Sequence, residues 1–410
     1  MTDAHVQLSQ LETQASQAGD GVWQGRFRSL RLSSVFQPVV TLRTGRVVGH
    51  EGLVRLDYAD GRGAAPFRFF SGGLDEAGLI ELDGLCRLLH LRNFQGQAAV
   101  DAGWLFLNVS PMVVAGHRRH GEFLSALLHK FGFDPARIVV EIAESGVQDG
   151  DTLAEAVSYY RRLGCLVAID DYGVGLSSLT RLWSLGVDIV KLDRELLLAA
   201  LARDEERRLL PSLVEFLHDC GTLVLMEGVE NQAEAQLALE VGCDLAQGFH
   251  FAVPAPRLHD GAEVIPIDSA RAGVATAAGT DDAVTQLAAA GAGLAAGAGL
   301  AEASAPLREL PATLRCYWVD AAGIQRSDNL LGTRAGMPRF ALLLDQPGSD
   351  VSGRGFFVRA IVYPAAVQRS RAYLQRGFGV ACVTLAVTAP LAGQPGVLCC
   401  DVVWRAAQTH

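Results

Sequence analysis

The sequence has no CxxC pair, no cluster of histidines and no excess of basic residues. Its eight cysteines are scattered along 410 residues, and several lie within apolar runs. This spacing excludes a disulfide framework and a zinc site with the usual ligand pattern, and it is typical of buried thiols in a reducing compartment. The net charge of −10 argues against a protein that binds long nucleic acid by its backbone, because such proteins carry basic faces.

Long apolar runs are absent as well. The longest weakly apolar stretch, LAAAGAGLAAGAGLA at 287–301, is too short to span a bilayer, and Ala and Gly contribute little to insertion. The N-terminal stretch MTDAHVQLSQLETQASQAGDG is polar and lacks the apolar core of a signal peptide. We therefore expect a cytoplasmic protein without a membrane span.

What the sequence does contain is a repeated unit between residues 33 and 254. A short apolar run, typical of a buried strand, is followed by a longer segment with helical spacing. The runs are SVFQPVV, RVVGHEGLV, WLFLNVS, RIVVEIAE, CLVAIDD, DIVKLD, TLVLMEG and AQGFHF. Eight strands alternating with helices predict an α/β protein with a TIM-type (β/α)8 barrel. No Gly-rich dinucleotide fingerprint follows the first run, which weakens the alternative of a Rossmann fold.

The composition changes after the barrel. We place a polar segment at 1–24, the barrel at 25–267 and an Ala/Gly-rich linker at 268–305, either flexible or a loose Ala-rich helix. Residues 306–410 predict a small α+β domain with a mostly antiparallel sheet. Its strand-like runs are CYWVDAAG, RFALLLDQ, GFFVRAIVY, VACVTLAVTAP and GVLCCDVVW, and its one short helical piece lies near PAAVQRSRAYLQ.

Every strand-like run of the barrel carries a polar residue at or near its end, where the chemistry of such barrels takes place. These residues are Gln37, Glu51, Asn108, Glu141, Asp170, Asp171, Lys191, Glu227 and Gln247. Each side chain can bind a metal, a phosphate or a base. Caps and turns would explain one or two of them but not one for every strand, so we predict a shared site.

Five of these residues are carboxylates that would converge on one pocket. At an effective dielectric of about 20, two unit charges about 4 Å apart repel by about 4 kcal/mol. Lys191 and Arg55 supply only two positive charges. Divalent cations resolve the imbalance, and carboxylate and amide oxygens suit Mg²⁺, Mn²⁺ or Ca²⁺ rather than Zn²⁺.

Two of the carboxylates, Asp170 and Asp171, are adjacent in the stretch VAIDDYGVG. Neighbouring side chains in a strand point to opposite faces, but where the strand ends and turns both can reach one site. Asp170 could then bridge two cations and Asp171 could bind the second, as in two-metal phosphoryl transfer. A simple turn is the alternative for this stretch taken alone.

Eight motifs, in this order, resemble one known family, the EAL-domain phosphodiesterases. The motifs are FQPVV, EGLVR, FLNVSP, EIAES, AIDDYGVGLSSL, VKLD, MEGVEN and QGFHF, and they cover roughly residues 25–255. The family members are bacterial enzymes that open cyclic di-GMP to the linear dinucleotide pGpG. The resemblance implies a barrel with one antiparallel strand, cyclic di-GMP as the substrate and a homodimer. No GGDEF-type signature is present, so we do not expect synthesis of the dinucleotide.

The resemblance also implies a role for each matched residue. A first metal would be bound by Glu51, Asn108, Glu141 and Asp170, and a second by Asp170 and Asp171. Glu227 would be the general base, and Lys191 would hold the water or the scissile phosphate. The nucleotide would be contacted by Gln37, Leu53, Arg55, Asp193 and Gln247, while Glu144 and Glu230 would support loops. The implied cofactors are Mg²⁺ or Mn²⁺, with Ca²⁺ as a candidate inhibitor.

Four of these residues also have a structural alternative. Lys191 could be a rim lysine whose stem covers apolar surface, and Arg55 could belong to a surface ion pair. Gln37 precedes a proline and could be a turn residue. Glu230 begins a helix-like segment and could be only a partner of the helix dipole.

The chain departs from the family pattern at four positions. The signature EAL reads EGL, which places Gly52 where a methyl group is usual and loosens the strand without removing a ligand. Ala143 and Val174 each stand where the family commonly has Thr, and Leu176 stands where it commonly has an aromatic residue. These changes put turnover in doubt more than nucleotide binding. One alternative is therefore an effector that binds cyclic di-GMP without useful turnover, and another is a scaffold that acts through its second domain.

The C-terminal segments YWVDAAGIQRSDNLL and GFFVRAIVYPAAVQRSRAYLQRGFGVACVTLAVTAP faintly resemble Cache or PAS-like sensor domains. The resemblance implies a small-molecule or protein partner for this domain and a regulatory role. A packing or dimerisation domain without a ligand is an equal alternative.

Overall fold

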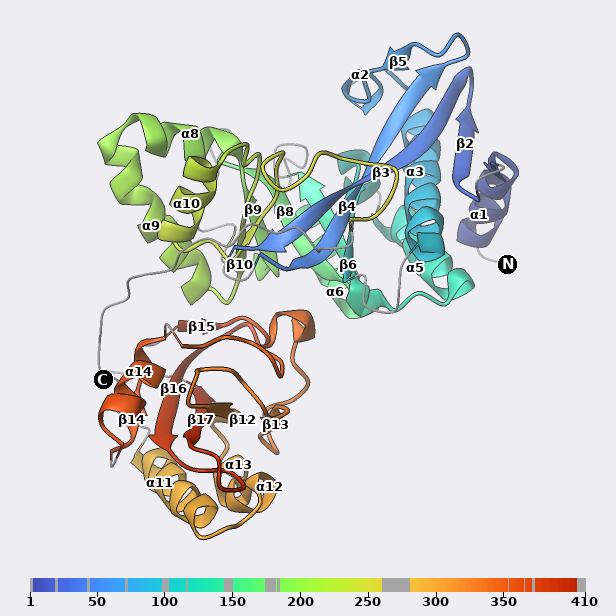
Figure 1. The fold of residues 1–410 in the computed structure, drawn as a ribbon. Helices are drawn as coiled ribbons and strands as arrows, with labels where there is room; N and C mark the ends of the chain where they lie inside the picture. Colours follow the sequence, from blue (N-terminus) through green and yellow to red (C-terminus); the bar gives the residue numbers. More distant parts are fainter. Residues whose placement is uncertain are drawn as a thin grey trace. The chain divides into compact units, whose positions relative to one another are not determined.

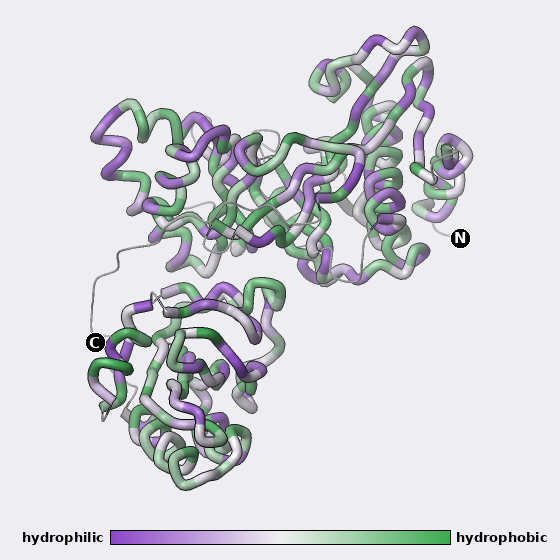
Figure 2. The backbone as a smooth tube through the Cα atoms, viewed as in Figure 1, coloured by the Kyte–Doolittle hydropathy of each residue, from purple (hydrophilic) through white to green (hydrophobic). Residues whose placement is uncertain are grey.

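The computed structural model describes residues 3–18, 21–42, 45–70, 73–97, 103–115, 117–143, 150–173, 182, 185–259, 281–352, 354–364, 366–370 and 373–403. The chain divides into two compact units, Met1–Ile267 and Asp268–His410 (Figure 1). Apolar residues are concentrated along the strands of both units (Figure 2).

Strands of the first unit close into a barrel. The ring runs in the order β3-β11-β10-β9-β8-β7-β6-β4, and the pairing of β4 with β3 closes it. Its strands are β3 (Leu30–Thr41), β4 (Val47–Tyr58), β6 (Trp104–Val109), β7 (Ile138–Ala143), β8 (Leu166–Tyr172), β9 (Ile189–Leu192), β10 (Leu223–Met226) and β11 (Leu245–Ala246). The prediction of a TIM-type barrel is confirmed. β3 is antiparallel to both of its neighbours while the other pairs are parallel, as the family resemblance implied.

Helices cover the outside of this barrel. They are α3 (Glu76–Gln97), α4 (Pro111–Ala115), α5 (His117–Phe131), α6 (Gly150–Leu163), α8 (Arg194–Ala202), α9 (Asp204–Asp219) and α10 (Gln232–Glu240). Outward-facing strand residues such as Leu105, Val140 and Val190 are fully buried against them. Strand residues of the other face, such as Trp104 and Phe106, are equally buried, and this alternation directs every second side chain into the barrel.

Short elements complete the first unit. They are α1 (Asp3–Thr13), β1 (Ala15–Gln17), β2 (Trp23–Phe27), β5 (Gly63–Ala64), α2 (Phe67–Phe70) and the 3₁₀ turn η1 (Pro135–Arg137). The polar segment that we placed before the barrel at 1–24 is therefore structured in its described part. Ala4, Leu8 and Leu11 of α1 are buried in the hydrophobic core of the first unit. These three apolar residues on one helix face attach an otherwise polar stretch, and α1 packs on α3 and α5.

The second unit contains an antiparallel sheet in the order β13-β12-β17-β16-β14, and β15 also pairs with β16. Its strands are β12 (Thr313–Asp320), β13 (Leu330–Leu331), β14 (Gln368–Arg369), β15 (Tyr373–Gln375), β16 (Val380–Thr388) and β17 (Gly396–Val403). Its helices are α11 (Asp281–Ala295), α12 (Leu300–Ala303), α13 (Ala305–Arg308) and α14 (Gly355–Val362), with a 3₁₀ turn η3 (Ala341–Leu343). α11 packs on one face of the sheet and α14 on the other (Figure 1).

The Ala/Gly-rich stretch that we placed at 268–305, either a flexible linker or a loose Ala-rich helix, contains helix α11, which belongs to the second unit. Leu287, Ala290 and Leu294 of α11 are buried in the core of the second unit. A Cβ added at Gly291 would lie 3.0 Å from Val387 of β16, so the small residues that look like a linker allow the helix to approach the sheet closely. Residues 260–280 lie outside the described residues.

Three further expectations for the C-terminal domain are wrong. GFFVRAIVY forms helix α14 rather than a strand, because Phe356, Phe357 and Ala360 occupy one helical face and are buried. RFALLLDQ contains the turn η3, and the piece near PAAVQRSRAYLQ contributes β14 and β15 instead of a helix. A short apolar run does not distinguish a strand from a buried helix.

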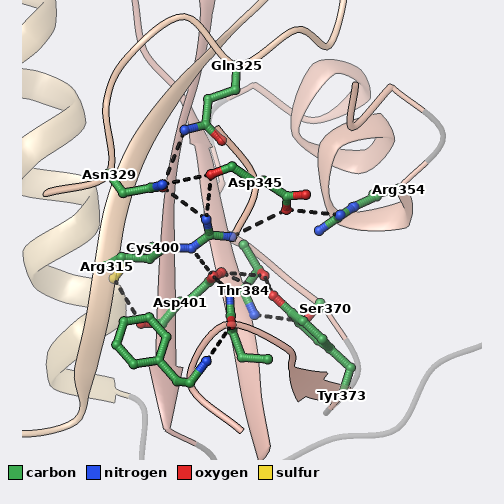
Figure 3. A network of polar contacts seen from close by, with 12 residues as sticks. Arg315, Gln325, Asn329, Asp345, Arg354, Ser370, Tyr373, Thr384, Cys400 and Asp401 are labelled. Carbon is green, nitrogen blue, oxygen red and sulfur yellow. Dashed lines mark hydrogen bonds and ion pairs between the residues drawn. The ribbon is translucent and has the colours of Figure 1, made fainter. Parts of the chain in front are cut away.

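A buried polar network lies on the α14 side of this sheet (Figure 3). Arg315 of β12 is fully buried, and its Nε donates to Asp401 Oδ2 of β17 at 2.6 Å. Its Nη1 donates to Asn329 Oδ1 at 2.9 Å, and Asp345 pairs with Arg354 at 3.0 Å. Tyr373 and other donors complete the shell of Asp401. The network ties the strands to the irregular segment between β13 and α14.

The structure bears on two expectations, buried free thiols and the absence of a membrane span. All eight cysteines are free, and seven of them are buried, as scattered thiols in apolar runs predict. None of the helices that the structure describes combines the length and the apolar character that crossing a bilayer requires.

Candidate functional site

The strand register brings the predicted polar residues together at the carboxyl ends of the barrel strands. Gln37 of β3 lies opposite Glu51 of β4, and Asn108 of β6 lies opposite Glu141 of β7. Gln37 is in the middle of β3 rather than in a turn, because β3 continues to Thr41. The parallel strands therefore present their polar ends on one rim of the barrel.

Lys191 lies at the centre of this rim. Its Nζ is 2.7 Å from Glu141 Oε1, 2.7 Å from Glu227 Oε1 and 2.9 Å from Asp170 Oδ1, and the distance to Glu51 Oε2 is 3.8 Å. The Lys191 side chain is only 1% exposed. The alternative of an exposed lysine whose stem covers apolar surface is therefore wrong. The single ammonium group of Lys191 faces four carboxylates.

Burial and like charges perturb the pKa values of this cluster. Burial raises the pKa of Glu141 well above its ordinary value, and Glu51 adds to this effect. Burial likewise raises the pKa of Glu227 to about 8, against the opposing effect of Lys191. Burial lowers the pKa of Lys191, but the surrounding carboxylates outweigh it and hold this pKa well above the ordinary value. The cluster therefore has more negative groups than its single ammonium can compensate.

Asp170 and Asp171 reach the same site through an irregularity in β8. Ile169 pairs with Val190 and Tyr172 pairs with Leu192, so β8 has one residue more than β9 over this interval. Asp171 has φ 56°, a left-handed conformation typical of a bulge. Carboxylate oxygens of Asp170, Asp171 and Glu227 lie within 4.8 Å of one another. The expectation that two adjacent carboxylates can face one site is met by a bulge rather than by the end of the strand.

Side-chain amides connect the carboxylates. Asn108 Nδ2 donates to Glu51 Oε1 at 2.8 Å and to Glu141 Oε2 at 3.0 Å. Gln247 Nε2 donates to Glu51 Oε2 at 2.7 Å and to Gln37 Oε1 at 3.2 Å. Both oxygens of Glu51 are thus held in place, so its carboxylate is oriented before any ligand binds.

An open cleft of about 170 Å³ lies over this cluster. It is lined by Gln37, Glu51, Glu227, Gly228, Glu230, Gln247, Gly248 and Phe249. β11 ends at Ala246, earlier than the run AQGFHF suggested. The chain then turns at Gly248, where an added Cβ would lie 2.0 Å from the Val229 carbonyl oxygen, so only glycine fits this close approach. The resulting turn leaves Phe249 60% exposed at the cleft. Sequence reasoning missed this residue, although an aromatic directly after Gln-Gly at a strand end was a usable signal.

Other predicted residues lie outside the cluster of ion pairs. Arg55 is exposed and its Nη1 donates to the Val54 carbonyl oxygen, and Leu53 is partly exposed on the same strand. Asp193 caps α8 by accepting a hydrogen bond from the Glu195 N–H at 2.7 Å. Glu144, Val174 and Leu176 lie outside the described residues.

Glu230 is held by a residue that the sequence did not single out. Arg194 Nη2 is 2.6 Å from Glu230 Oε2 and 3.3 Å from Glu234 Oε1. The stem of Arg194 also packs on Gly228, where an added Cβ would lie 2.7 Å from Arg194 Cδ. Arg194 thus fixes the loop that follows Glu227, and Glu230 has an ion-pair partner beyond the dipole of α10.

Fold and cluster together define a TIM-type barrel with a candidate divalent-cation site at the carboxyl ends of its strands. Residues 22–254 match the family model described as the EAL domain. Because this match covers more than half of the sequence, the chain belongs to the EAL-domain family.

Known relatives are similar over the barrel. An uncharacterized protein of Azorhizobium caulinodans is 33% identical over 239 residues, which are 55% of this chain and 31% of that protein. Cyclic di-GMP phosphodiesterase RocR of Pseudomonas aeruginosa is 30% identical over 232 residues, or 56% of this chain and 58% of RocR. The solved EAL enzyme Bd1971, in a form with bound cAMP and cyclic di-GMP, has a TM-score of 0.51 at 24% identity over 55% of this chain and 62% of that chain, which supports the fold. The chain spans less than two thirds of each of these proteins.

Proposed function

We propose that the barrel hydrolyses cyclic di-GMP to linear pGpG with two divalent cations, Mg²⁺ or Mn²⁺. The observation that carries the proposal is the charge of the cluster. Glu51, Glu141, Asp170, Asp171 and Glu227 bring five negative charges when ionised, and Lys191 brings one positive charge. Four negative charges remain, which the four positive charges of two divalent cations would balance.

The donor atoms fit such cations. Carboxylate oxygens from adjacent strands and an Asn amide are the ligands that Mg²⁺ and Mn²⁺ prefer. Asp170 and Asp171 bring carboxylate oxygens within 4.8 Å of each other and of the base Glu227, and Glu51, Asn108 and Glu141 form the other side of the cluster. A bound cation would supply Lewis-acid stabilisation of the phosphate and a lower pKa for bound water.

The chain's own residues divide the remaining tasks. Glu227 accepts the proton of the attacking water at a carboxylate oxygen, because burial makes this carboxylate more basic than usual. Lys191 directs its ammonium at Glu227 and Asp170, which orients the base and places positive charge next to the phosphate. Gln37 and Gln247 lie at the base of the cleft and bind the nucleotide, with Leu53, Arg55 and Asp193 around them.

The effector alternative predicts binding without product. Purified protein is incubated with cyclic di-GMP and Mg²⁺ or Mn²⁺, and the products are separated by chromatography. The proposal expects linear pGpG to accumulate with either cation and not in EDTA. Binding without pGpG under both conditions would favour the effector. Failure to bind any nucleotide would favour a scaffold acting through the second unit. Two further proposals are a small-molecule or protein partner for the second unit and a homodimer of the whole chain, as the EAL resemblance implies.

Phe249 provides a test of nucleotide binding in the cleft. An exposed aromatic ring at the mouth of a nucleotide site stacks on a base, and such stacking contributes about 1–3 kcal/mol per base. We expect Phe249→Ala to weaken the binding of cyclic di-GMP by about tenfold or more. Affinity is measured by calorimetry in a Glu227→Gln background, so that the nucleotide stays intact. Phe67→Ala, which removes an aromatic ring that is 76% exposed on α2 and does not line the cleft, is the control. Equal affinity of both variants would contradict the stacking role.

A further inference from the structure

The family signature has Ala at the position of Gly52, and a residue of α3 explains why this chain has glycine there. A Cβ added at Gly52 would lie 2.9 Å from His90 Cγ and 3.0 Å from His90 Cβ, whereas carbon atoms in contact pack at about 3.5–4.0 Å. The His90 ring thus occupies the space that the methyl group would take. The expectation that Gly52 loosens the strand is wrong, because the position is filled from the helix.

His90 is held firmly in this place. It is 4% exposed, and its Nδ1 lies 2.8 Å from Ser34 Oγ of β3. Asn93, almost one turn further along α3, donates from Nδ2 to the same Ser34 oxygen at 3.2 Å and to the Trp23 carbonyl oxygen of β2 at 2.8 Å. Its Oδ1 accepts a hydrogen bond from the Trp23 N–H at 2.7 Å. Burial lowers the pKa of His90 to about 3, so the ring is neutral. α3 is therefore joined to β2 and β3 by hydrogen bonds around this ring.

The ring lies directly behind two residues of the site. In the register of β3 and β4, Gln37 pairs with Glu51 and the preceding residue Phe36 pairs with Gly52. Adjacent residues of a strand face opposite sides, so Gln37 and Glu51 face the barrel interior while Phe36 and Gly52 face α3. The Phe36 and His90 rings are in edge contact, with centroids 6.5 Å apart. His90 thus supports the strand pair at the level of Glu51.

We propose that His90 is a positioning residue for Glu51. The missing side chain of Gly52 leaves the space that the His90 ring occupies. Close-packed interiors transmit a displacement rather than absorb it, so the position of β4 against His90 determines where the Glu51 carboxylate lies. That carboxylate is aligned by hydrogen bonds of 2.8 Å from Asn108 and 2.7 Å from Gln247. The Gly52–His90 pair therefore preserves the site in a chain that lacks the signature's methyl group. The inference rests on the proposed function where Mn²⁺ binding is measured, but not where the position of Glu51 is measured.

The test is a cycle of four proteins: the wild type, Gly52→Ala, His90→Ala and the double variant. Gly52→Ala is expected to weaken Mn²⁺ binding at least tenfold, because its methyl group displaces β4 from the helix. In the double variant the ring is absent, so the affinity should recover most of that loss. Gly96→Ala, at a position of the same helix where an added Cβ meets nothing within 4 Å, is the control. A double variant no better than Gly52→Ala would overturn the proposal.

A crystal structure of Gly52→Ala without metal or nucleotide tests the positioning role of His90 directly. We expect the Glu51 carboxylate to lose its hydrogen bond with Asn108 or Gln247, and we expect thermal stability of the double variant to exceed that of Gly52→Ala. An unmoved Glu51 would overturn the positioning role. If the wild type makes no pGpG, the proposed function fails, but the position of Glu51 in this structure still answers the question about His90.

Discussion

Replacing Glu227 by Gln is expected to reduce hydrolysis of cyclic di-GMP by about 10²- to 10⁴-fold, the range that general acid–base catalysis contributes. The amide keeps the shape of the side chain but cannot accept a proton from water. Glu227 is the carboxylate whose oxygens face both Lys191 at 2.7 Å and the acidic pair Asp170 and Asp171. It also lines the cleft, so a substrate phosphate in the cleft would lie next to it.

The measurement is the initial rate of pGpG formation at saturating substrate, compared with nucleotide affinity. We expect kcat to fall while the affinity for cyclic di-GMP changes by less than about tenfold, because a group acting in the transition state contributes little to ground-state binding. Glu205→Gln, an exposed position in the first turn of α9, serves as the control. If Glu227→Gln retains a rate within threefold of the wild type, Glu227 is not the base.

Lys191→Met is expected to be destabilising as well as inactive. The substitution removes the ammonium group that faces Glu141, Asp170 and Glu227 and leaves their charges uncompensated. Removing one partner of a buried ion pair costs about 3–5 kcal/mol. For a unit of this size that corresponds to a fall of about 10 °C in the unfolding midpoint. Hydrolysis is expected to be lost because the ammonium group of Lys191 no longer orients Glu227 or places positive charge next to the phosphate.

The measurement is thermal unfolding in EDTA and again with Mn²⁺. The account expects Mn²⁺ to raise the midpoint of Lys191→Met by more than it raises that of the wild type, because the cation offsets the same negative charge. Lys130→Met is the matched control, since Lys130 pairs with Glu12 at the surface and is 44% exposed, where ion pairs contribute little. A Lys191→Met protein as stable as Lys130→Met in EDTA would show that the carboxylates are not ionised around the lysine.

The barrel could be predicted from the sequence because its strands are marked by a strong period. Apolar runs such as the one ending at Asp170 are bounded by helical segments, and one polar residue at each strand end points to a common rim. The antiparallel direction of β3 could not be found in this way, since a strand has the same alternation in either direction. The bulge at Asp171 was equally hidden, because its φ of 56° is a property of the folded backbone.

The second unit was predicted less well because its signals are short or ambiguous. GFFVRAIVY has enough β-branched and aromatic residues for a strand, yet its buried residues Phe356, Phe357 and Ala360 follow a helical face. The Ala/Gly composition around Gly291 is equally typical of a flexible linker and of an Ala-rich helix, and the burial of Leu287 and Leu294 in the folded unit distinguishes the two. Tertiary packing against the sheet determines both segments, and local composition does not show it.

Binding of Mn²⁺ to the wild-type protein tests the central claim most directly. The claim is that five carboxyl groups around the single ammonium of Lys191 make a site for two divalent cations. Calorimetric titration of metal-free protein should give two Mn²⁺ per chain, and Asp171→Asn should reduce this number to one. Saturable binding of two cations that depends on Asp171 is the result we expect. Absence of saturable Mn²⁺ binding, or an unchanged number of two in Asp171→Asn, would contradict the account of the site.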